Sequence, residues 1–259
     1  MSQSRKVWLQ QYFFVIWELT GRELKRKYSR SKLGIIWSVL NPLLNMIILS
    51  LIFSHMFKRS IENYPIYYLC GNVLWALFTT GTNTAMTALV DNKQMLLKVK
   101  IPMQVFIVSR IYTAFVNFGY SLIAFVPILV FYHVRLNMAM LCIPIIVFFQ
   151  ILFMLGVSYI LSVAYVFFGD IKHLYGILLT LWMYLSAIFY PAESLPDTMR
   201  KVVMHNPIFQ FIDGMRNIIY LQKMPSPENL ISMAAWGTVV YLLGTLIFRR
   251  NKNRIIQKL

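Results

Sequence analysis

In the stretch Arg22–Leu44, RELKRKYSRSKLGIIWSVLNPLL, a dense basic cluster gives way abruptly to an apolar run. Six of its first eleven residues are basic, namely Arg22, Lys25, Arg26, Lys27, Arg30 and Lys32. From Leu33 to Phe57 the chain then carries no acidic or basic residue except His55. An apolar run of about 20 residues can cross a bilayer as a helix, and Lys and Arg collect on its cytoplasmic side. The stretch therefore predicts a first membrane span whose N-terminal end is held in the cytoplasm.

The composition places the whole chain in the same class. Of its 259 residues, 58% are hydrophobic and only 13% are charged, and the mean hydropathy is +0.61. Soluble domains contain about 25% charged residues, so this chain has too few polar groups to cover a water-facing surface. Cys70 and Cys142 each lie in an apolar segment and indicate neither a disulfide nor a metal site.

The net charge of +16 is distributed unevenly. With the spans given below, 18 of the 25 Lys and Arg residues and four of the nine acids fall on one side of the membrane. The two sides then carry about +14 and about +2, which is the asymmetry of cytoplasmic and external loops. A nucleic-acid-binding protein would need a basic groove or a known motif, and the sequence contains no such motif.

The sequence predicts an all-α integral membrane protein of the plasma membrane, with both termini in the cytoplasm. Residues 1–34 form a basic, amphipathic segment, 35–248 the transmembrane domain, and 249–259 a basic tail. The first 30 or so residues are too charged for a cleaved signal peptide, so we expect the first span to act as an uncleaved insertion signal. Six segments are long and apolar enough to span: 35–57, 66–90, 104–132, 139–168, 173–190 and 230–248.

Three segments outside these spans also show helical patterns. Within residues 5–30, Trp8, Tyr12, Val15 and Leu19 recur at helical spacing, which predicts an interfacial helix that either anchors the chain or docks a partner. Residues 91–103, DNKQMLLKVKIPM, begin with an N-cap pair and predict a short cytoplasmic amphipathic helix. The external segment 191–229 predicts two short helices at or dipping into the outer interface. The second of these begins at Asn206-Pro207 and carries the apolar stripe Ile208, Phe211, Ile212, Met215 and Ile219.

Several motifs resemble, in order along nearly the whole chain, those of the ABC-2 permeases that export polysaccharides. They are RKY at 26–28, SKLGIIW at 31–37, LNPL at 40–43, KVKIP at 98–102, DIKHL at 170–174, IFYP at 188–191, and the segment from Asn206-Pro207-Ile208 through Arg216. One departure is Gly169, where members of this family commonly have arginine, so no role of that arginine is carried over.

The resemblance implies the membrane subunit of an exporter for O-antigen, capsule or teichoic acid chains. It implies two copies of this chain paired with two copies of a separate ATPase, which would bind ATP and Mg. The sequence agrees on one independent point, because it contains no G-x-x-x-x-G-K-[ST] phosphate loop. We therefore expect no cofactor in this chain.

Polar and aromatic residues inside the spans are candidates for a substrate channel, because polar groups in a membrane tend to face protein or water. They follow helical spacing in the first span and seven-residue spacing in the fifth, and small and polar residues could equally hold helices together. The candidate channel residues are Trp37, Asn41, Asn45, Tyr175, Trp182, Ser186, Phe189 and Tyr190, with a weaker second-span set of Asn72, Thr79 and Asn83. The candidate residues for ATPase docking are Asp91, Asn92, Lys93, Met95, Leu96, Leu97 and Lys98.

Three further residues bear on the alternatives. Arg110 lies about two turns inside the third span, and we expect it to extend to the cytoplasmic surface rather than to contact substrate. Asp170 and His173, at a span boundary, are expected to cap or orient a helix. No Asp or Glu lies in the middle of a span, which disfavours an ion-coupled carrier. The sequence also lacks the paired carboxylates or H-E-x-x-H of a membrane enzyme, whereas an exporter of drugs or small hydrophobic molecules stays open as an alternative.

Overall fold

The computed structural model describes residues 2–29, 33–56, 61–98 and 101–259. Arg30, Lys32, Phe57, Lys100 and the side chain of Trp8 lie outside what it describes. Within these ranges the regular elements are all helical, which confirms the predicted all-α class. In chain order they are α1 (Ser2–Tyr28), α2 (Ile36–Met56), α3 (Tyr64–Asp91), α4 (Lys93–Lys98), α5 (Gln104–Phe131), η1 (Met138–Cys142), α6 (Ile143–Phe167), α7 (Ile171–Tyr184), η2 (Ala192–Ser194), α8 (Asp197–Met204), α9 (Pro207–Ile219) and α10 (Pro227–Lys258).

Five segments among the described residues are long and apolar enough to cross a membrane. They correspond to α2, α3, α5, η1 with α6, and α10. The fifth expected span, 173–190, instead falls on α7, which has only 14 residues. At 1.5 Å per residue α7 is about 21 Å long, shorter than a bilayer core. The sequence was therefore right about an apolar helix here and wrong about its length.

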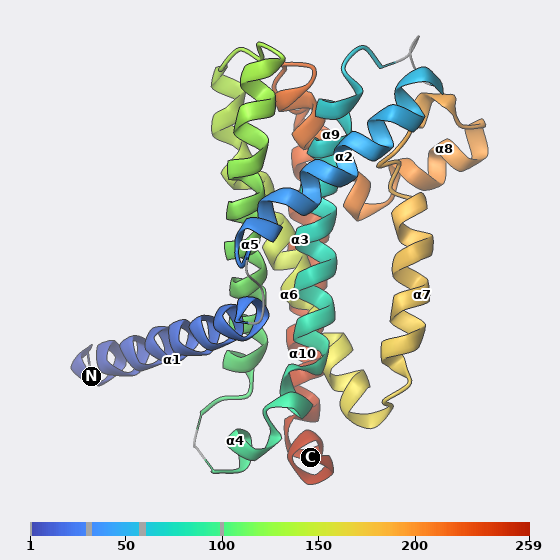
Figure 1. The fold of residues 1–259 in the computed structure, drawn as a ribbon. Helices are drawn as coiled ribbons and strands as arrows, with labels where there is room; N and C mark the ends of the chain where they lie inside the picture. The colour runs from blue at the N-terminus through green and yellow to red at the C-terminus, as the bar shows by residue number, and fades with distance from the viewer. Residues whose placement is uncertain (1, 30–32, 57–60, 99–100) are drawn as a thin grey trace.

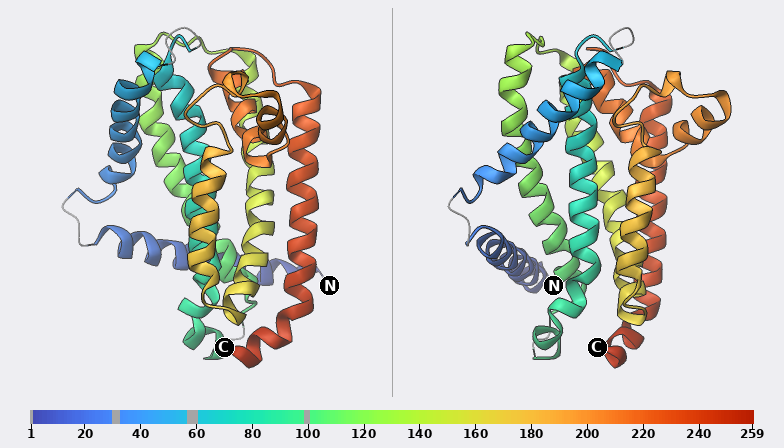
Figure 2. Two further views of the ribbon diagram at one scale, coloured as in Figure 1. Left: turned by 90° about the vertical axis from the view of Figure 1, so that its right-hand side faces the viewer. Right: turned by 45° about the vertical axis from the view of Figure 1, so that its right-hand side comes forward.

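An upright bundle of α3, α5, α6 and α10 forms the centre of the molecule, and α3 lies in its middle (Figures 1 and 2). In the most apolar stretch of α3, 61% of the residues are buried inside the chain, compared with 11% for α2. α2 slants across one side of the bundle, and α7 stands on another (Figure 1). Both α2 and α7 therefore leave much of their apolar surface uncovered by this chain.

The pair α6 and α10 is held together by backbone contact at glycines. A Cβ built on Gly156 of α6 would collide with the backbone of Val240 and Tyr241, and one on Gly244 of α10 would collide with the backbone of Gly156. Small residues at such a crossing let two membrane helices approach closely enough for van der Waals packing to hold them.

Helix α1 lies nearly perpendicular to the bundle, and both ends of the chain lie toward the same end of the molecule (Figures 1 and 2). On α1, Leu19 is buried, and Tyr12 and Val15 pack against the core, so the described part of the predicted stripe faces the bundle. Phe13 and Trp17, on the other side of the helix, are 70% and 65% exposed. This arrangement suits a helix that lies along a membrane interface with apolar residues on both faces.

The two short helices predicted within 191–229 are present as α8 and α9. The Asn206 side chain accepts a hydrogen bond from the Ile208 backbone N–H at 3.0 Å, so the predicted cap of α9 is confirmed. All five residues of the predicted apolar stripe of α9 are buried. Helix α9 packs against α3, α10 and α6 rather than lying free on the surface.

Candidate functional site

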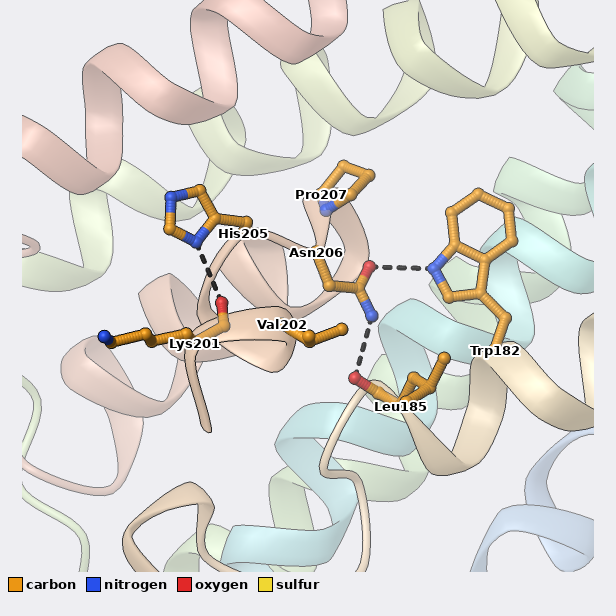
Figure 3. A pocket seen from close by; sticks show the side chains of 7 residues that line it. All are labelled: Trp182, Leu185, Lys201, Val202, His205, Asn206 and Pro207. Atoms are coloured by element: carbon orange, nitrogen blue, oxygen red, sulfur yellow. Dashed lines mark hydrogen bonds between the residues drawn. The ribbon is translucent and has the colours of Figure 1, made fainter. Parts of the chain in front are cut away.

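The end of α7 is fixed by hydrogen bonds from the segment that leads into α9. The Trp182 Nε1–H donates to the Asn206 Oδ1 at 2.8 Å, and the Asn206 Nδ2–H donates to the Leu185 carbonyl at 2.9 Å (Figure 3). The same amide nitrogen also donates to the Ser186 Oγ at 3.0 Å. The Ser186 hydroxyl in turn donates to the Trp182 carbonyl at 2.7 Å. The last carbonyls of a helix need partners from outside that helix, and Asn206 supplies one here.

Arg216 of α9 holds the backbone just beyond the end of α7. It is 5% exposed, and its Nη2 donates to the Ala187 and Ile188 carbonyls, both at 2.9 Å. The guanidinium carbon also lies 3.5 Å from the ring centroid of Tyr67 in α3, a cation–π arrangement. Ala187 has a positive φ of 46°, which breaks the helical path, and the Arg216 contacts hold this break in place.

The electrostatics around α9, which lies outside the five candidate spans, follow from its burial. Burial lowers the pKa of the Arg216 guanidinium, and nearby charges, including that of Asp213, oppose this shift. Burial also raises the pKa of the Asp213 carboxyl, while Arg216 and Asn217 oppose the rise. Arg216 therefore joins α9, α3 and the end of α7 as one buried polar unit, because a cation at this depth needs several oxygen partners.

The candidate channel residues of the fifth span mostly face the inside of the chain. Tyr175 is 4% exposed and donates its hydroxyl to the Thr82 Oγ1 at 2.7 Å. Phe189 stacks on Tyr68 with ring centroids 6.0 Å apart, and the Tyr190 hydroxyl donates to the Tyr184 carbonyl. Within a single chain these residues pack helices together.

Trp182, from the same set, borders open space. It lines a cavity of about 560 Å³ between the end of α7 and the start of α9 (Figure 3). The other lining residues are Leu185, Lys201, Val202, His205, Asn206 and Pro207. The ring of Trp182 also packs edge-on against Phe78, at a centroid distance of 5.3 Å. Its position is thus set by both a hydrogen bond and ring packing.

The candidate channel residues of the first span are more exposed. Trp37 is 40% exposed and lines, with Asn41, a pocket of about 160 Å³ that Lys27, Thr80 and Asn117 also border. Asn45 is exposed on the same helix. Among the described residues, the first-span and fifth-span sets line different pockets.

Tyr184, which the seven-residue spacing missed, presents an aromatic ring on the outer side of α7. It is 56% exposed, and Leu174, Ile177 and Leu181 of the same helix are also exposed. The spacing identified one face of this helix correctly, but it could not tell which face would be turned inward.

The candidate docking residues lie around α4, at the same end of the molecule as the C-terminus (Figure 1). Lys93, Leu97 and Lys98 are exposed, whereas Met95 and Leu96 are partly buried. A cavity of about 540 Å³ opens here, bordered by Tyr12, Leu96, Leu97, Lys98, Ile101, Pro102, Met103, Lys252, Ile256 and Leu259. The N-terminal helix and the C-terminal turn of α10 therefore contribute to the same surface as α4.

Two capping predictions need correction. The Asn92 side chain is buried, with its Nδ2 donating to the Ala88 carbonyl at 2.8 Å and its Oδ1 accepting from Arg22 at 2.7 Å. It thus ties α3 to α1, and the first turn of α4 uses the Asn92 backbone carbonyl instead. Asp170 occupies the N-cap position of α7 without a hydrogen bond from its side chain. Its backbone carbonyl accepts from the N–H groups of His173 and Leu174.

For Arg110 the structure shows ion pairs that the sequence analysis did not anticipate. Its side chain is 11% exposed and pairs with Glu23 of α1 and with Asp91 at the end of α3. A buried guanidinium is stable only with such partners, and α1 brings one of them to it. The presence of Glu23 within a basic cluster, together with an arginine inside a span, was the available signal for this pair.

Comparison with known proteins places the chain in a family. The profile of the ABC-2 type transporter matches residues 15–220. The chain is 30% identical over 97% of both lengths to the O-antigen export system permease protein RfbA of Myxococcus xanthus. It is 26% identical over 99% of both lengths to a protein of that name from Klebsiella pneumoniae. It is 19% identical to the polysialic acid transport protein KpsM of Escherichia coli, over 91% of this chain and 92% of KpsM. The chain therefore belongs to the ABC-2 type transporter family.

Proposed function

We propose that this chain is the membrane-spanning subunit of an ATP-driven exporter that carries a cell-surface polysaccharide, bound to a lipid carrier, out of the cytoplasm. The main support is its similarity along almost its whole length to permeases named for O-antigen export. The ATP and Mg would bind to a separate ATPase subunit, because this sequence lacks a phosphate loop. The complex would contain two copies of each subunit in the plasma membrane, with both ends of this chain in the cytoplasm.

The channel would form where two copies of the chain meet along α2 and α7. These helices leave much of their apolar surface uncovered, and contiguous exposed apolar surface marks either lipid or a protein partner. In this proposal Trp37, Asn41 and Asn45 line the channel on α2. Trp182, Phe189 and Tyr190 shape its outer end, and Tyr175 and Ser186 support them.

A polymer suits a channel of this composition. Aromatic faces can stack on the apolar faces of successive sugars without requiring one hydrogen-bond pattern, so the chain can slide. Amide and hydroxyl groups such as those of Asn41 and Asn45 can exchange hydrogen bonds with sugar hydroxyls. The side chains of Asn41 and Asn45 carry no charge that would hold an ion or an anionic sugar tightly.

The ATPase would dock on the surface made by α4, α1 and the last turn of α10. Exposed Leu97 offers an apolar contact, and Lys98 and Lys252 border the same cavity. This surface lies at the end of the molecule where both chain termini are found, which is the cytoplasmic end in the proposal (Figure 1).

The experiment that tests this function removes the gene from its native host and measures surface polysaccharide. The proposal expects the polymer to disappear from the cell surface and to accumulate inside, and a plasmid copy to restore it. Unchanged surface polymer, together with new sensitivity to small hydrophobic toxins, would instead identify a small-molecule exporter.

A further inference from the structure

The ion pairs around Arg110, of which only Arg110–Glu23 is buried, form a continuous polar connection between α1, α3, α4 and α5. Arg110 lies on α5 and binds the carboxylate of Glu23 on α1, and its Nη2 lies 3.2 Å from the Asp91 Oδ2 at the end of α3. Arg22 lies 3.6 Å from Glu23, so the cluster holds two cations and two anions. The side chains of Arg110 and Glu23 are only 11% and 12% exposed. Water therefore screens this pair poorly, and losing one partner would leave a buried charge.

The same cluster reaches the first turn of α4. Arg22 donates to the Asn92 Oδ1 at 2.7 Å. The Asn92 backbone carbonyl accepts from the N–H groups of Met95 and Leu96 in α4, both at 3.0 Å. A force that tilts α4 therefore acts on Asn92 and, through Arg22 and the Glu23–Arg110 pair, on α1.

The C-terminal end of α1 is bonded in turn to α2 and α5. The Tyr28 hydroxyl donates to the Asn117 Oδ1 of α5 at 2.8 Å and is hydrogen-bonded to the Ser38 hydroxyl of α2. Lys27 also donates to the Asn117 Oδ1, at 3.2 Å. Ser38 is the neighbour of Trp37, which the proposed function places in the channel. Helix α1 is thus bonded through Arg22 to Asn92, next to α4, and through Tyr28 to Ser38, near the start of α2.

Of the five candidate spans that the structure describes, α2 is the one least buried within the chain. A helix with few buried contacts moves at a smaller free-energy cost than one in the packed core. Movement applied at α1 should therefore shift α2 more readily than α3, which α5, α6 and α9 surround.

We propose that Arg110 is a positioning residue for energy coupling, which, with Glu23, Asp91 and Arg22, transmits movement of α4 through α1 to α2. This inference rests on the proposed function, in which the ATPase acts on α4. It assigns to α1 a role beyond anchoring, because α1 becomes the mechanical link between the ATPase side and the channel helix. Energy coupling needs an element that can take up two discrete positions. An ionic cluster that switches between two arrangements can favour one position or the other.

The test measures polymer transported per ATP hydrolysed by the full permease–ATPase complex in inverted membrane vesicles. The variants are E23Q, R110Q, R110K and the double variant E23Q/R110Q, with R135Q as the control. E23Q leaves Arg110 with Asp91 as a partner. Arg135 is an exposed arginine in the turn between α5 and η1, so R135Q removes a charge without touching the cluster.

Transport per ATP should fall in E23Q and R110Q by roughly two- to thirtyfold, the range of coupling changes along such networks. Protein abundance and co-purification of the ATPase should stay normal. Transport per ATP in the double variant should equal that of the more impaired single variant, because both substitutions remove the same Glu23–Arg110 ion pair. R110K should fall between R110Q and wild type, since a lysine cannot hold two carboxylates in the fixed geometry of a guanidinium. R135Q should match the wild type.

Wild-type transport per ATP in both E23Q and R110Q would overturn the inference and leave the cluster as an anchor. The inference would also be overturned if E23Q were less abundant, or bound less ATPase, to a degree that accounts for all of its lost transport. Failure of the proposed function gives a different result, because the wild-type complex itself would then show no ATP-dependent polymer transport.

Discussion

The Trp182 indole N–H donates to the Asn206 Oδ1 at 2.8 Å, which ties the last turn of α7 to the residue that caps α9. One asparagine side chain therefore holds the backbone at the end of α7 and also caps the start of α9. The position of the Trp182 ring, and with it the shape of the cavity in Figure 3, depends on this amide.

Replacing Asn206 by alanine should destabilise the protein by on the order of 2 kcal/mol. The change removes the cap of α9 and leaves the Trp182 N–H and the Leu185 carbonyl without their partner. Thermal unfolding of the detergent-solubilised protein measures this loss. N253A, at an exposed position on α10, is the matched control and should unfold like wild type; an N206A transition as high as that of N253A would contradict the assignment.

Replacing Gly156 by alanine should destabilise the α6–α10 pair by about 1–3 kcal/mol, the usual cost of overpacking. The new methyl group would meet the backbone of Val240, which cannot move aside as a flexible side chain could. G119A is the control, because a Cβ on Gly119 of α5 meets nothing within 4 Å. Unfolding temperatures of the two variants in the same detergent should differ, with G119A at or above wild type. Equal temperatures would show that α6 and α10 do not pack as described.

Replacing Trp37 by alanine should lower polymer export by roughly two- to tenfold if each sugar stacks on this ring during passage. Protein abundance and ATPase binding should not change, because Trp37 is 40% exposed in the single chain. The control is F131A, which removes an aromatic ring that is 73% exposed at the end of α5 and should leave export unchanged. A combined variant with alanine at Trp37, Trp182 and Tyr190 that is abundant and exports normally would remove these residues from the channel.

Replacing Leu97 by aspartate should release the ATPase while the permease stays inserted in the membrane. Leu97 is 60% exposed, so a charge there disturbs docking more than folding, whereas Met95 and Leu96 pack against the core. Co-purification of the two subunits is the measurement. L136D, at a position 89% exposed in the turn after α5, should keep the ATPase bound. Retention of the ATPase by L97D would place the docking surface elsewhere.

Much of the fold could be predicted because membrane spans and caps are local signals. Runs of apolar residues located the spans, and the apolar stripe of α9 emerged from spacing alone. The cap at Asn206 was predictable for the same reason, since an asparagine followed by proline has a local backbone preference. Each of these features depends on residues within one short, continuous segment of the chain.

The features that sequence reasoning missed depend on residues far apart in the chain. The backbone that follows α7 is held by Asn206, which binds the Leu185 carbonyl, and by Arg216, which binds the Ala187 and Ile188 carbonyls. Both residues follow this backbone by about two to three dozen positions. The partner of Arg110 is Glu23, 87 residues earlier. The seven-residue spacing of Tyr175 and Trp182 gave a common face, but only the packing of α7 against α3 and α6 decides that this face is turned inward.

ATP-dependent movement of the polymer through the reconstituted complex tests the central claim most directly. The purified chain and its ATPase subunit are inserted into vesicles with the ATPase outside, and the host's lipid-linked glycan is supplied on the same side. The account predicts that ATP makes the glycan resistant to an added glycosidase, and that omitting ATP or this chain abolishes the protection. Protection that needs a proton gradient instead of ATP, or that never appears in a complex that hydrolyses ATP, would contradict it.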